Sequence, residues 1–321
     1  MRTPFGGEAP YGHDGVHTAM VHCGRAALRL LIAGGLKKKT FLVPDFLCGV
    51  IIDVLRRHRV KYGFYRVKAD LAPDLGDIRA RRFDVLYVVN YFGQKTVVPK
   101  ALLKGRMLIV DDVFAPILEA PQGVKDWAAL NSLRKVTVLA EGAFVSSTRP
   151  LALKTVDHKP AAFAVLKYKA KQMKADHLAK GKGSQFSYLR AFVRAETGLD
   201  GDQGIHAPSV QTMGLLPSVL LDIGKEQGIR RRQYAMLDGS LRRYSVPLRP
   251  RYFSFYVLSV ERRDALKKHL ADRGIFLPAH WPRVAGADNP LYSRLLSIPL
   301  DSRYNEGQLR AVASAIRGFL S

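Results

Sequence analysis

Short apolar runs alternate with segments of helical spacing over the first 110 residues of the chain. Most of these runs are apolar at nearly every position, which is typical of strands buried on both faces of a parallel sheet. The predicted strands are 40–43, 62–67, 85–89 and 107–110, and the predicted helices between and around them are 25–32, 49–59, 75–81 and 99–103. Alternation of this kind predicts an α/β fold with helices covering a parallel sheet.

The pattern becomes more helical and then changes character in the second half. Two short strands are predicted at 136–138 and 142–147, followed by a helical stretch at 161–200 that Gly181 and Gly183 interrupt, and by a long helix at 218–241. The remainder predicts strands at 252–258 and 275–277 and helices at 262–272 and 305–320. We therefore expect an irregular lead-in at 1–20, a large domain at 21–240 and a small α+β domain at 241–321.

Composition narrows the class of protein without choosing a function. A chain of 321 residues that is 47% hydrophobic can bury a substantial core. Its first eleven residues are polar and rich in Gly and Pro, and no run approaches the roughly 18 apolar residues of a membrane span, so we expect a cytoplasmic protein with no membrane partner. The two cysteines, Cys23 and Cys48, suit free thiols in a reducing compartment, and alone they cannot form a four-ligand zinc site. No metal site is expected.

The net charge of +24 points to an anionic partner of some kind. Polyanions, acidic membrane surfaces and phosphorylated small molecules are all attracted by such a field. The densest basic stretch includes Lys167, Lys169 and Lys171, where lysines and tyrosines alternate as they do on some nucleic-acid-binding faces. A solvated helix face is the commoner meaning of one charge run, and we favour it while keeping nucleic acid open as a partner.

An acidic pair followed by a lysine marks the stretch from Val110 to Ser147. Asp111 and Asp112 end the apolar run 107–110, and Lys135 follows some two dozen residues later. Ligands in open α/β sheets bind beyond the carboxyl ends of strands, so Asp112 falls where a cofactor is expected. A carboxylate that keeps a pyridine nitrogen protonated and a lysine that forms a Schiff base are what pyridoxal phosphate (PLP) requires. Taken alone, however, such an acidic pair is more often a strand-end turn.

A glycine precedes the first predicted helix and could serve the same cofactor. Gly24 leaves the backbone N–H groups of the first turn free to receive a phosphate. A glycine N-cap with no ligand is the commoner reading of such a position.

The order of several motifs resembles that of the DegT/DnrJ/EryC1/StrS aminotransferases. These are PLP-dependent enzymes of fold type I that aminate keto-sugars attached to nucleotides. The resemblance extends from about residue 20 to the last helix and rests on Cys23-Gly24-Arg25-Ala26-Ala27-Leu28, Val43-Pro44-Asp45-Phe46-Leu47-Cys48, Asn90-Tyr91-Phe92-Gly93, Val110-Asp111-Asp112, Lys135 with Glu141-Gly142, Arg231-Arg232-Gln233-Tyr234, Ala279-His280-Trp281-Pro282 and Ile298-Pro299-Leu300. It implies a large domain with a mostly parallel seven-stranded sheet covered by helices, plus a small C-terminal α+β domain.

The resemblance also implies roles for individual residues. Lys135 takes the Schiff-base position and Asp112 the position that pairs with the pyridine nitrogen. The remaining assignments are phosphate binding by Ser132 and by the backbone at Gly24, Arg25 and Ala26, stacking on the cofactor by Phe46 or Tyr91, and substrate contact by His280 and Trp281. The implied reaction moves an amino group, with glutamate as the expected donor, to a nucleotide-linked keto-sugar in a homodimeric enzyme.

Several positions depart from the family pattern. Ala115 stands where most members have Gln or His three residues after the aspartate, Leu47-Cys48 replaces a threonine and a stacking aromatic, and Ala143 replaces a second glycine. These departures keep a second hypothesis open, in which a catalytically altered member of the fold binds a polyanionic partner. A third, a dehydratase of the same family, is disfavoured because dehydratases carry histidine in place of the lysine.

Overall fold

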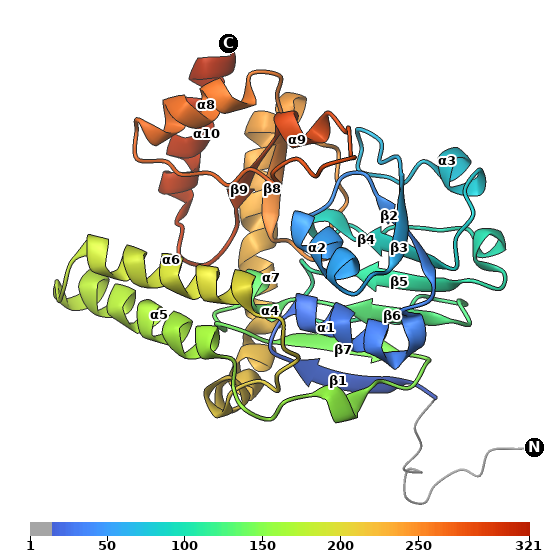
Figure 1. Cartoon of the computed structure of the whole chain (residues 1–321). Coiled ribbons are helices and arrows are strands. Elements are labelled where there is room, and N and C mark those ends of the chain that lie inside the picture. The colour runs from blue at the N-terminus through green and yellow to red at the C-terminus, as the bar shows by residue number, and fades with distance from the viewer. Residues whose placement is uncertain (1–14) are drawn as a thin grey trace, which may run out of the picture.

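A seven-stranded sheet organises the larger part of the molecule, which a computed structural model describes for residues 15–321 (Figure 1). The strand order is β1-β7-β6-β5-β4-β2-β3, and only β7 runs antiparallel to its neighbours. The strands are β1 His17–Val21, β2 Thr40–Pro44, β3 Lys61–Tyr65, β4 Val85–Val89, β5 Met107–Asp111, β6 Trp127–Leu130 and β7 Ala143–Ser147. This arrangement confirms the predicted mostly parallel α/β sheet.

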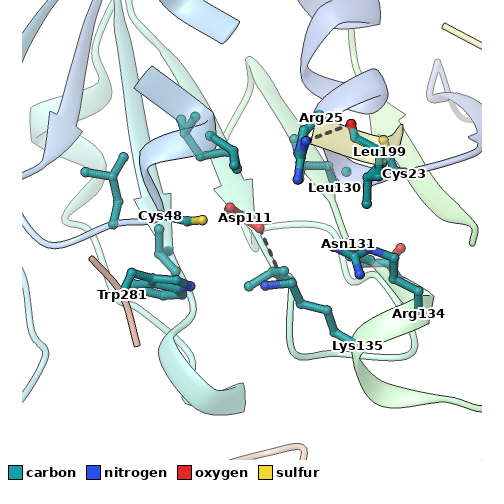
Figure 2. A pocket seen from close by; sticks show the side chains of 17 residues that line it. Cys23, Arg25, Cys48, Asp111, Leu130, Asn131, Arg134, Lys135, Leu199 and Trp281 are labelled. Atoms are coloured by element: carbon teal, nitrogen blue, oxygen red, sulfur yellow. Dashed lines mark hydrogen bonds between the residues drawn. The ribbon is translucent and has the colours of Figure 1, made fainter. Parts of the chain in front are cut away.

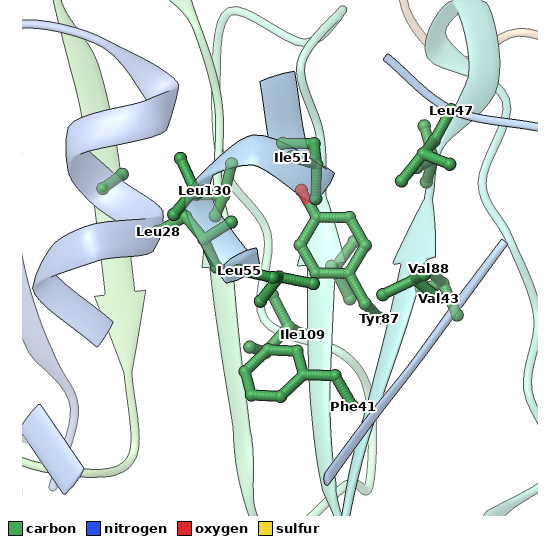
Figure 3. Close-up of a cluster of buried hydrophobic side chains, with 14 of the residues drawn as sticks. Leu28, Phe41, Val43, Leu47, Ile51, Leu55, Tyr87, Val88, Ile109 and Leu130 are labelled. Carbon is green, nitrogen blue, oxygen red and sulfur yellow. The ribbon is translucent and has the colours of Figure 1, made fainter. Parts of the chain in front are cut away.

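Helices pack on this sheet through apolar stripes. In Figure 3, Leu28 of α1 and Leu55 of α2 meet the side chains of Phe41, Tyr87 and Ile109 from three neighbouring strands. The helices of this part are α1 Gly24–Leu31, which continues as a π-helical turn at Ile32–Leu36, α2 Gly49–Arg57, α3 Leu75–Arg79, the short α4 Leu133–Val136 and the 3₁₀ turns Tyr91–Gly93, Lys100–Leu103 and Leu153–Thr155. Burying such stripes is the main driving force for this layer packing.

Three long helices follow β7. Helices α5 Ala162–Lys180 and α6 Gln185–Gly201 form an antiparallel hairpin that extends away from the sheet in Figure 1. Gly181 ends α5 in the left-handed conformation, and Ser184 caps α6 by accepting the Ser187 N–H. Helix α7 Val210–Leu241 then crosses to the C-terminal part of the chain.

The C-terminal part has a sheet and a core of its own. Strands β8 Phe255–Ser259 and β9 Leu295–Pro299 pair antiparallel, with helices α8 Arg263–Ala271, α9 Leu291–Arg294 and α10 Glu306–Leu320 beside them and a 3₁₀ turn at Arg242–Tyr244 before them. Leu237 and Leu241 of α7 belong to this second core. We therefore propose that the boundary between the two units falls in the last turns of α7, near residue 240.

Three sequence predictions need correction and one strand was missed, each for a local reason. The lead-in is not irregular throughout, because 17–21 form the edge strand β1; residues 1–14 lie outside the described part. The predicted strand 136–138 does not exist, since α4 ends at Val136 and Val138 is exposed. Strand β6 was missed because small residues dominate it. The second strand of the small sheet is β9, whereas 275–277 is irregular.

Within residues 15–321, no helix combines the length and apolarity that crossing a bilayer demands.

Candidate functional site

A cavity lies at the carboxyl ends of the central strands, where segments from distant parts of the chain meet. Figure 2 shows Arg25 at the start of α1, Asp111 at the end of β5, Lys135 on α4 and Trp281 from the C-terminal part around this cavity. Open α/β folds bind their ligands at this edge of the sheet. The cavity is the candidate site.

Lys135 is held in the cavity wall by the short helix α4. The Leu133 N–H donates to the Gly142 carbonyl oxygen at 2.9 Å, which anchors that helix beside β7. Burial lowers the pKa of the Lys135 amine; the charge of Arg134 lowers it further, whereas Asp111 and Cys48 act in the opposite direction. A lowered pKa increases the fraction of neutral, nucleophilic amine.

Asp111 faces the same cavity and is buried. Its carboxylate accepts the Tyr87 hydroxyl at 2.6 Å and the Val113 N–H at 3.1 Å. Burial raises the pKa of Asp111 to about 6, although the Tyr87 hydrogen bond and the Lys135 charge oppose the increase. Asp111 is therefore a buried carboxylate that lines the same cavity as the Lys135 amine.

Asp112 lies on the other side of the strand end and does not line the cavity. Its carboxylate accepts the Asn90 side-chain N–H at 2.7 Å and faces Arg251 at 3.4 Å. Successive side chains of an extended strand point to opposite faces, so only one of two adjacent aspartates can face Lys135. Of the two adjacent aspartates, Asp111 lines the cavity and Asp112 does not.

Because Asp111 and not Asp112 lines the cavity, the residue that stands three positions after the cavity aspartate also changes. Counted from Asp111, that residue is Phe114, and the Lys135 Nζ lies 5.8 Å from the centroid of its ring. Ala115 is fully buried outside the cavity, and its carbonyl oxygen accepts the Asn131 side-chain N–H at 3.2 Å. The departure noted at Ala115 is therefore not a missing cavity contact. Ala143 is likewise buried away from the cavity, at the start of β7.

The start of α1 and Ser132 line the same cavity as the amine. A Cβ on Gly24 would come within 3.2 Å of the Asn131 carbonyl oxygen, so glycine permits this close approach of α1 to the 131–132 segment. Ser132 is the N-cap residue of α4, yet its hydroxyl makes no capping hydrogen bond. Of the predicted set, Gly24, Arg25 and Ser132 line the cavity, whereas Ala26 is buried beneath it.

The Arg25 side chain is already engaged. It donates to the Leu199 carbonyl oxygen at 2.9 Å and to the Asp200 carboxylate at 2.8 Å. Its contribution at the cavity is therefore its backbone N–H and a charge partly neutralised by Asp200.

The aromatic candidates divide into one residue at the cavity and three behind it. Trp281 lines the cavity, whereas Phe46 and Tyr91 are buried behind it, with the Phe46 ring 5.3 Å from the ring of Trp281. His280 does not line the cavity: its ring packs against aromatic side chains, and its Nδ1 lies 3.0 Å from the Ser297 hydroxyl. Burial lowers the pKa of His280 to about 3, so this imidazole is neutral.

Sequence reasoning missed Asp111 as the cavity carboxylate, and it also missed Cys23 and Arg134 as lining residues. Cys23 is the N-cap of α1, and Leu47 and Cys48 line the side near Trp281. The sequence signal for Cys23 and Arg134 was adjacency alone, since each precedes a residue that was singled out, Gly24 or Lys135.

A mostly parallel seven-stranded sheet, covered by helices and carrying a lysine and a carboxylate in one cavity at its carboxyl edge, defines an α/β protein with the architecture of fold type I. Neither the protein-family models nor the curated protein sequences that were compared with this chain give a match.

Solved structures do match over almost the whole chain. DesV of S. venezuelae is 17% identical with a TM-score of 0.64, and the match covers 94% of this chain and 84% of that one. A DegT DnrJ EryC1 StrS aminotransferase from Brucella abortus is 18% identical with a TM-score of 0.60, covering 94% and 86%. 3-Amino-5-hydroxybenzoic acid synthase is 17% identical with a TM-score of 0.63, and the match covers 95% of this chain and 86% of that one. These likenesses confirm the fold expected from the sequence.

Proposed function

We propose that this protein is a PLP-dependent aminotransferase that transfers an amino group from an amino acid, with glutamate as the expected donor, to a keto-sugar. The observation that carries the proposal is the placement of Lys135 and Asp111 in one cavity that the start of α1 also lines. Among the structures of similar fold are a sugar aminotransferase, CalS13 from Micromonospora echinospora, and DesI with its TDP-sugar product, which supports a nucleotide-linked acceptor.

The residues present fit PLP in three respects. An amine of lowered pKa can bond the aldehyde, a buried carboxylate can hold the pyridine nitrogen protonated, and the backbone N–H groups at the start of α1 can bind a phosphate. When bound, the cofactor supplies the electron sink that stabilises negative charge on the substrate carbon. No metal ligand is required for this chemistry.

Each residue then has a defined task in the proposed reaction. Lys135 would hold the cofactor, and its Nζ would carry the proton to and from the substrate carbon. Asp111, whose carboxylate accepts the Tyr87 hydroxyl, would keep the pyridine nitrogen charged. The backbone N–H groups of Gly24 and Arg25 and the Ser132 hydroxyl would bind the phosphate. Trp281 lines the side where the cavity meets the C-terminal unit and is the remaining candidate for substrate contact.

A homodimer in the cytoplasm completes the proposal. The hairpin and α7 expose large apolar side chains, including Phe186, Val193 and Leu221, which a second copy of the chain could cover. Cys23 and Cys48 are free thiols, as a reducing compartment would keep them.

The polyanion-binding alternative gains little from the structure. Lys167 is buried and paired with Glu196, whereas Lys169 is exposed, so the basic stretch does not form one continuous face. We therefore retain the aminotransferase as the single proposed function.

The test is a spectrum of the purified protein with PLP added. We expect the wild type to develop the absorbance band of lysine-bound cofactor, and Lys135→Ala to lack it. Asp111→Asn should bind the cofactor but lose activity by about two orders of magnitude or more, because the pyridine nitrogen loses its charged partner. Asp112→Asn is the matched control, and its effect on the spectrum should be small. A wild type that PLP does not colour would overturn the proposal.

A further inference from the structure

Basic residues gather at the amino edge of the large sheet, where its parallel strands begin and β7 ends, opposite the edge that carries the lysine cavity. In Figure 1 the chain enters β1 at this edge, on the right, whereas the α5–α6 hairpin extends to the left. At the entrances to β2, β3, β4, β5 and β6 and after β7 stand, in that order, Lys37 to Lys39, Arg59 with Lys61, Arg81 with Arg82, Lys104 with Arg106, Lys125, and Arg149. Because these six strands lie side by side, cations from distant parts of the sequence form one row along the amino edge.

Most of the charge in this row is not compensated. Lys38, Lys104 and Lys125 are exposed, and among residues 15–321 no ion pair joins any of the three to a carboxylate. Two aspartates stand at the same strand entrances. Asp84 accepts the Thr40 N–H at 2.8 Å, and Asp126 accepts the Arg149 side chain at 2.9 Å. Cations therefore clearly outnumber carboxylates at the amino edge.

A groove lies within this row, between the segment that leads into β5 and the segments next to β6 and β7. Its basic lining residues are Lys100, Lys104, Arg106, Lys125 and Arg149. Among the described residues that line it, Asp126 is the single carboxylate, and Arg149 already binds it. The groove therefore offers a concave and strongly positive surface.

The size and polarity of the amino edge favour a long polar anion. Neighbouring strands lie about 4.8 Å apart, so six strands give a row roughly 24 Å long, the length of roughly seven base pairs of a duplex. The large apolar residues at the strand entrances, Leu36, Val60, Phe83 and Leu103, are buried. These side chains therefore offer nothing to insert into a bilayer and no apolar centre for a protein interface.

Stacking on unpaired bases is also not favoured at this edge. Proteins that bind single strands present aromatic rings to the bases. Phe83 is buried, and the Arg106 guanidinium covers its ring at 4.3 Å from the centroid. Contacts from this edge are therefore contacts of cations with phosphates.

We propose that the amino edge binds the phosphate backbone of a nucleic-acid duplex without reading its sequence. Lysine and arginine neutralise backbone phosphates, and the release of condensed counterions drives such binding. The site is distinct from the basic stretch 167–182, which belongs to the helical hairpin. It goes beyond the proposed aminotransferase and does not depend on it, because the amino edge and the lysine cavity lie at opposite ends of the strands.

The test measures fluorescence anisotropy of a labelled DNA duplex of mixed sequence, titrated with the full chain in the presence of PLP at several salt concentrations. The test variant combines Lys38→Gln, Lys104→Gln and Lys125→Gln, which lie before three different strands. We expect it to bind the duplex at least about tenfold more weakly. Its logarithmic salt dependence should be less steep by about two to three, since each phosphate contact contributes about 0.9.

The matched control combines Lys169→Gln, Lys180→Gln and Lys182→Gln. These lysines are exposed on the hairpin, so the control loses the same net charge away from the amino edge. It should keep the affinity of the wild type within about twofold, and thermal melts check that both variants fold. Equal weakening in the two variants would show that only net charge matters and would overturn the proposal. So would the absence of duplex binding by the wild type at about 50 mM salt.

Two further probes separate a duplex from other anions. The duplex has a higher charge density than one of its strands, so it should bind more tightly than the single strand. Tighter binding of the single strand, or of vesicles that contain phosphatidylserine, would overturn the assignment to a duplex.

The cofactor spectrum keeps this proposal apart from the proposed function. If PLP gives no absorbance band but the duplex still binds through Lys38, Lys104 and Lys125, the aminotransferase proposal fails and the nucleic-acid site stands. If the band forms and the test variant binds the duplex as the wild type does, only the nucleic-acid site is lost.

Discussion

At the scale of single residues, His22 is the most unusual titratable group outside the proposed reaction. Its ring is fully buried between β1 and α1, its Nε2 lies 3.2 Å from the Asp202 carboxylate, and its Nδ1 lies 3.3 Å from the His206 carbonyl oxygen. Burial alone would lower the pKa of His22, but hydrogen bonds to Asp202 and to the Cys23 thiol and their charges raise it to about 9. The Nδ1 of the ring also accepts the His206 N–H at 3.1 Å, so the imidazole ties the loop after α6 to the start of α1.

This raised pKa predicts that His22 stabilises the fold at neutral pH and loses its effect in alkali. The folded pKa of about 9 exceeds the ordinary value of 6.5, so the contribution is fully present below pH 6.5 and disappears as the pH rises through 9. The shift corresponds to at most about 3 kcal/mol. We expect His22→Gln to be destabilised relative to wild type at pH 6 and to approach it at pH 10, in urea unfolding at each pH.

Asp202→Asn supplies the control for this linkage. If the pair is responsible, the double variant should lose little more than either single variant, because both remove the same interaction. A difference between wild type and His22→Gln that does not change from pH 6 to pH 10 would contradict the assignment.

Single residues also show which parts of the candidate site can be predicted from the sequence and which cannot. Lys135, Gly24 and Ser132 could be found from motif order, because each role depends on residue type and spacing. The choice between Asp111 and Asp112 could not, since both are aspartates and only the strand's alternation decides which one faces the amine.

At the scale of secondary-structure elements, Gly93 connects the two units of the molecule. Its carbonyl oxygen accepts the Arg251 N–H at 2.8 Å, and its backbone has φ +84°, a conformation that glycine adopts readily and other residues rarely. A Cβ at this position would overlap the Tyr252 carbonyl oxygen. The 3₁₀ turn Tyr91–Gly93 and the segment before β8 can approach this closely only because residue 93 is glycine.

Gly93→Ala should therefore destabilise the protein by at least about 2 kcal/mol. The free-energy cost of the strained φ and the cost of displacing the Tyr252 backbone add together. Gly239→Ala is a matched change in α7 at an exposed position with open space around the new methyl group, and it should stabilise by up to about 1 kcal/mol. Denaturant unfolding of the two variants measures both effects. Equal stabilities would show that the 93–252 contact does not hold the two units together.

Strands and helices could be predicted from the sequence where a single hydrophobic pattern determined them. Strand β4 was placed residue for residue because all five of its positions are buried and apolar. Strand β6 was missed because Ala128 and Ala129 have no β-branch, and they are buried only through pairing with β5 and β7. Helix α7 begins at Val210, earlier than predicted, because Ser209 caps it and Pro217 is accommodated inside it.

At the scale of the whole molecule, the exposed apolar side chains gather on the hairpin and on the first half of α7. On α6 they recur at Phe186, Leu189 and Val193, a spacing that forms a stripe along one side of the helix, and on α7 they include Val210, Met213 and Leu221. A group of exposed apolar side chains on a protein with a net charge of +24 is typical of an interface between protein chains. A second copy of the chain is the occupant that the proposed function expects.

Sedimentation of the purified protein tests whether a second copy of the chain covers these apolar side chains. We expect the wild type to sediment at twice the mass of the 35.7 kDa chain and Val193→Glu combined with Leu221→Glu to sediment as a monomer, because burying two carboxylates in an apolar interface is strongly unfavourable. Phe276→Glu is the matched control, since Phe276 is as exposed but lies in the C-terminal unit, and this variant should remain a dimer. A wild type that sediments as a monomer at micromolar concentration would leave the stripes to another partner. A double variant that is monomeric yet still takes up PLP would show that one chain alone completes the cofactor site.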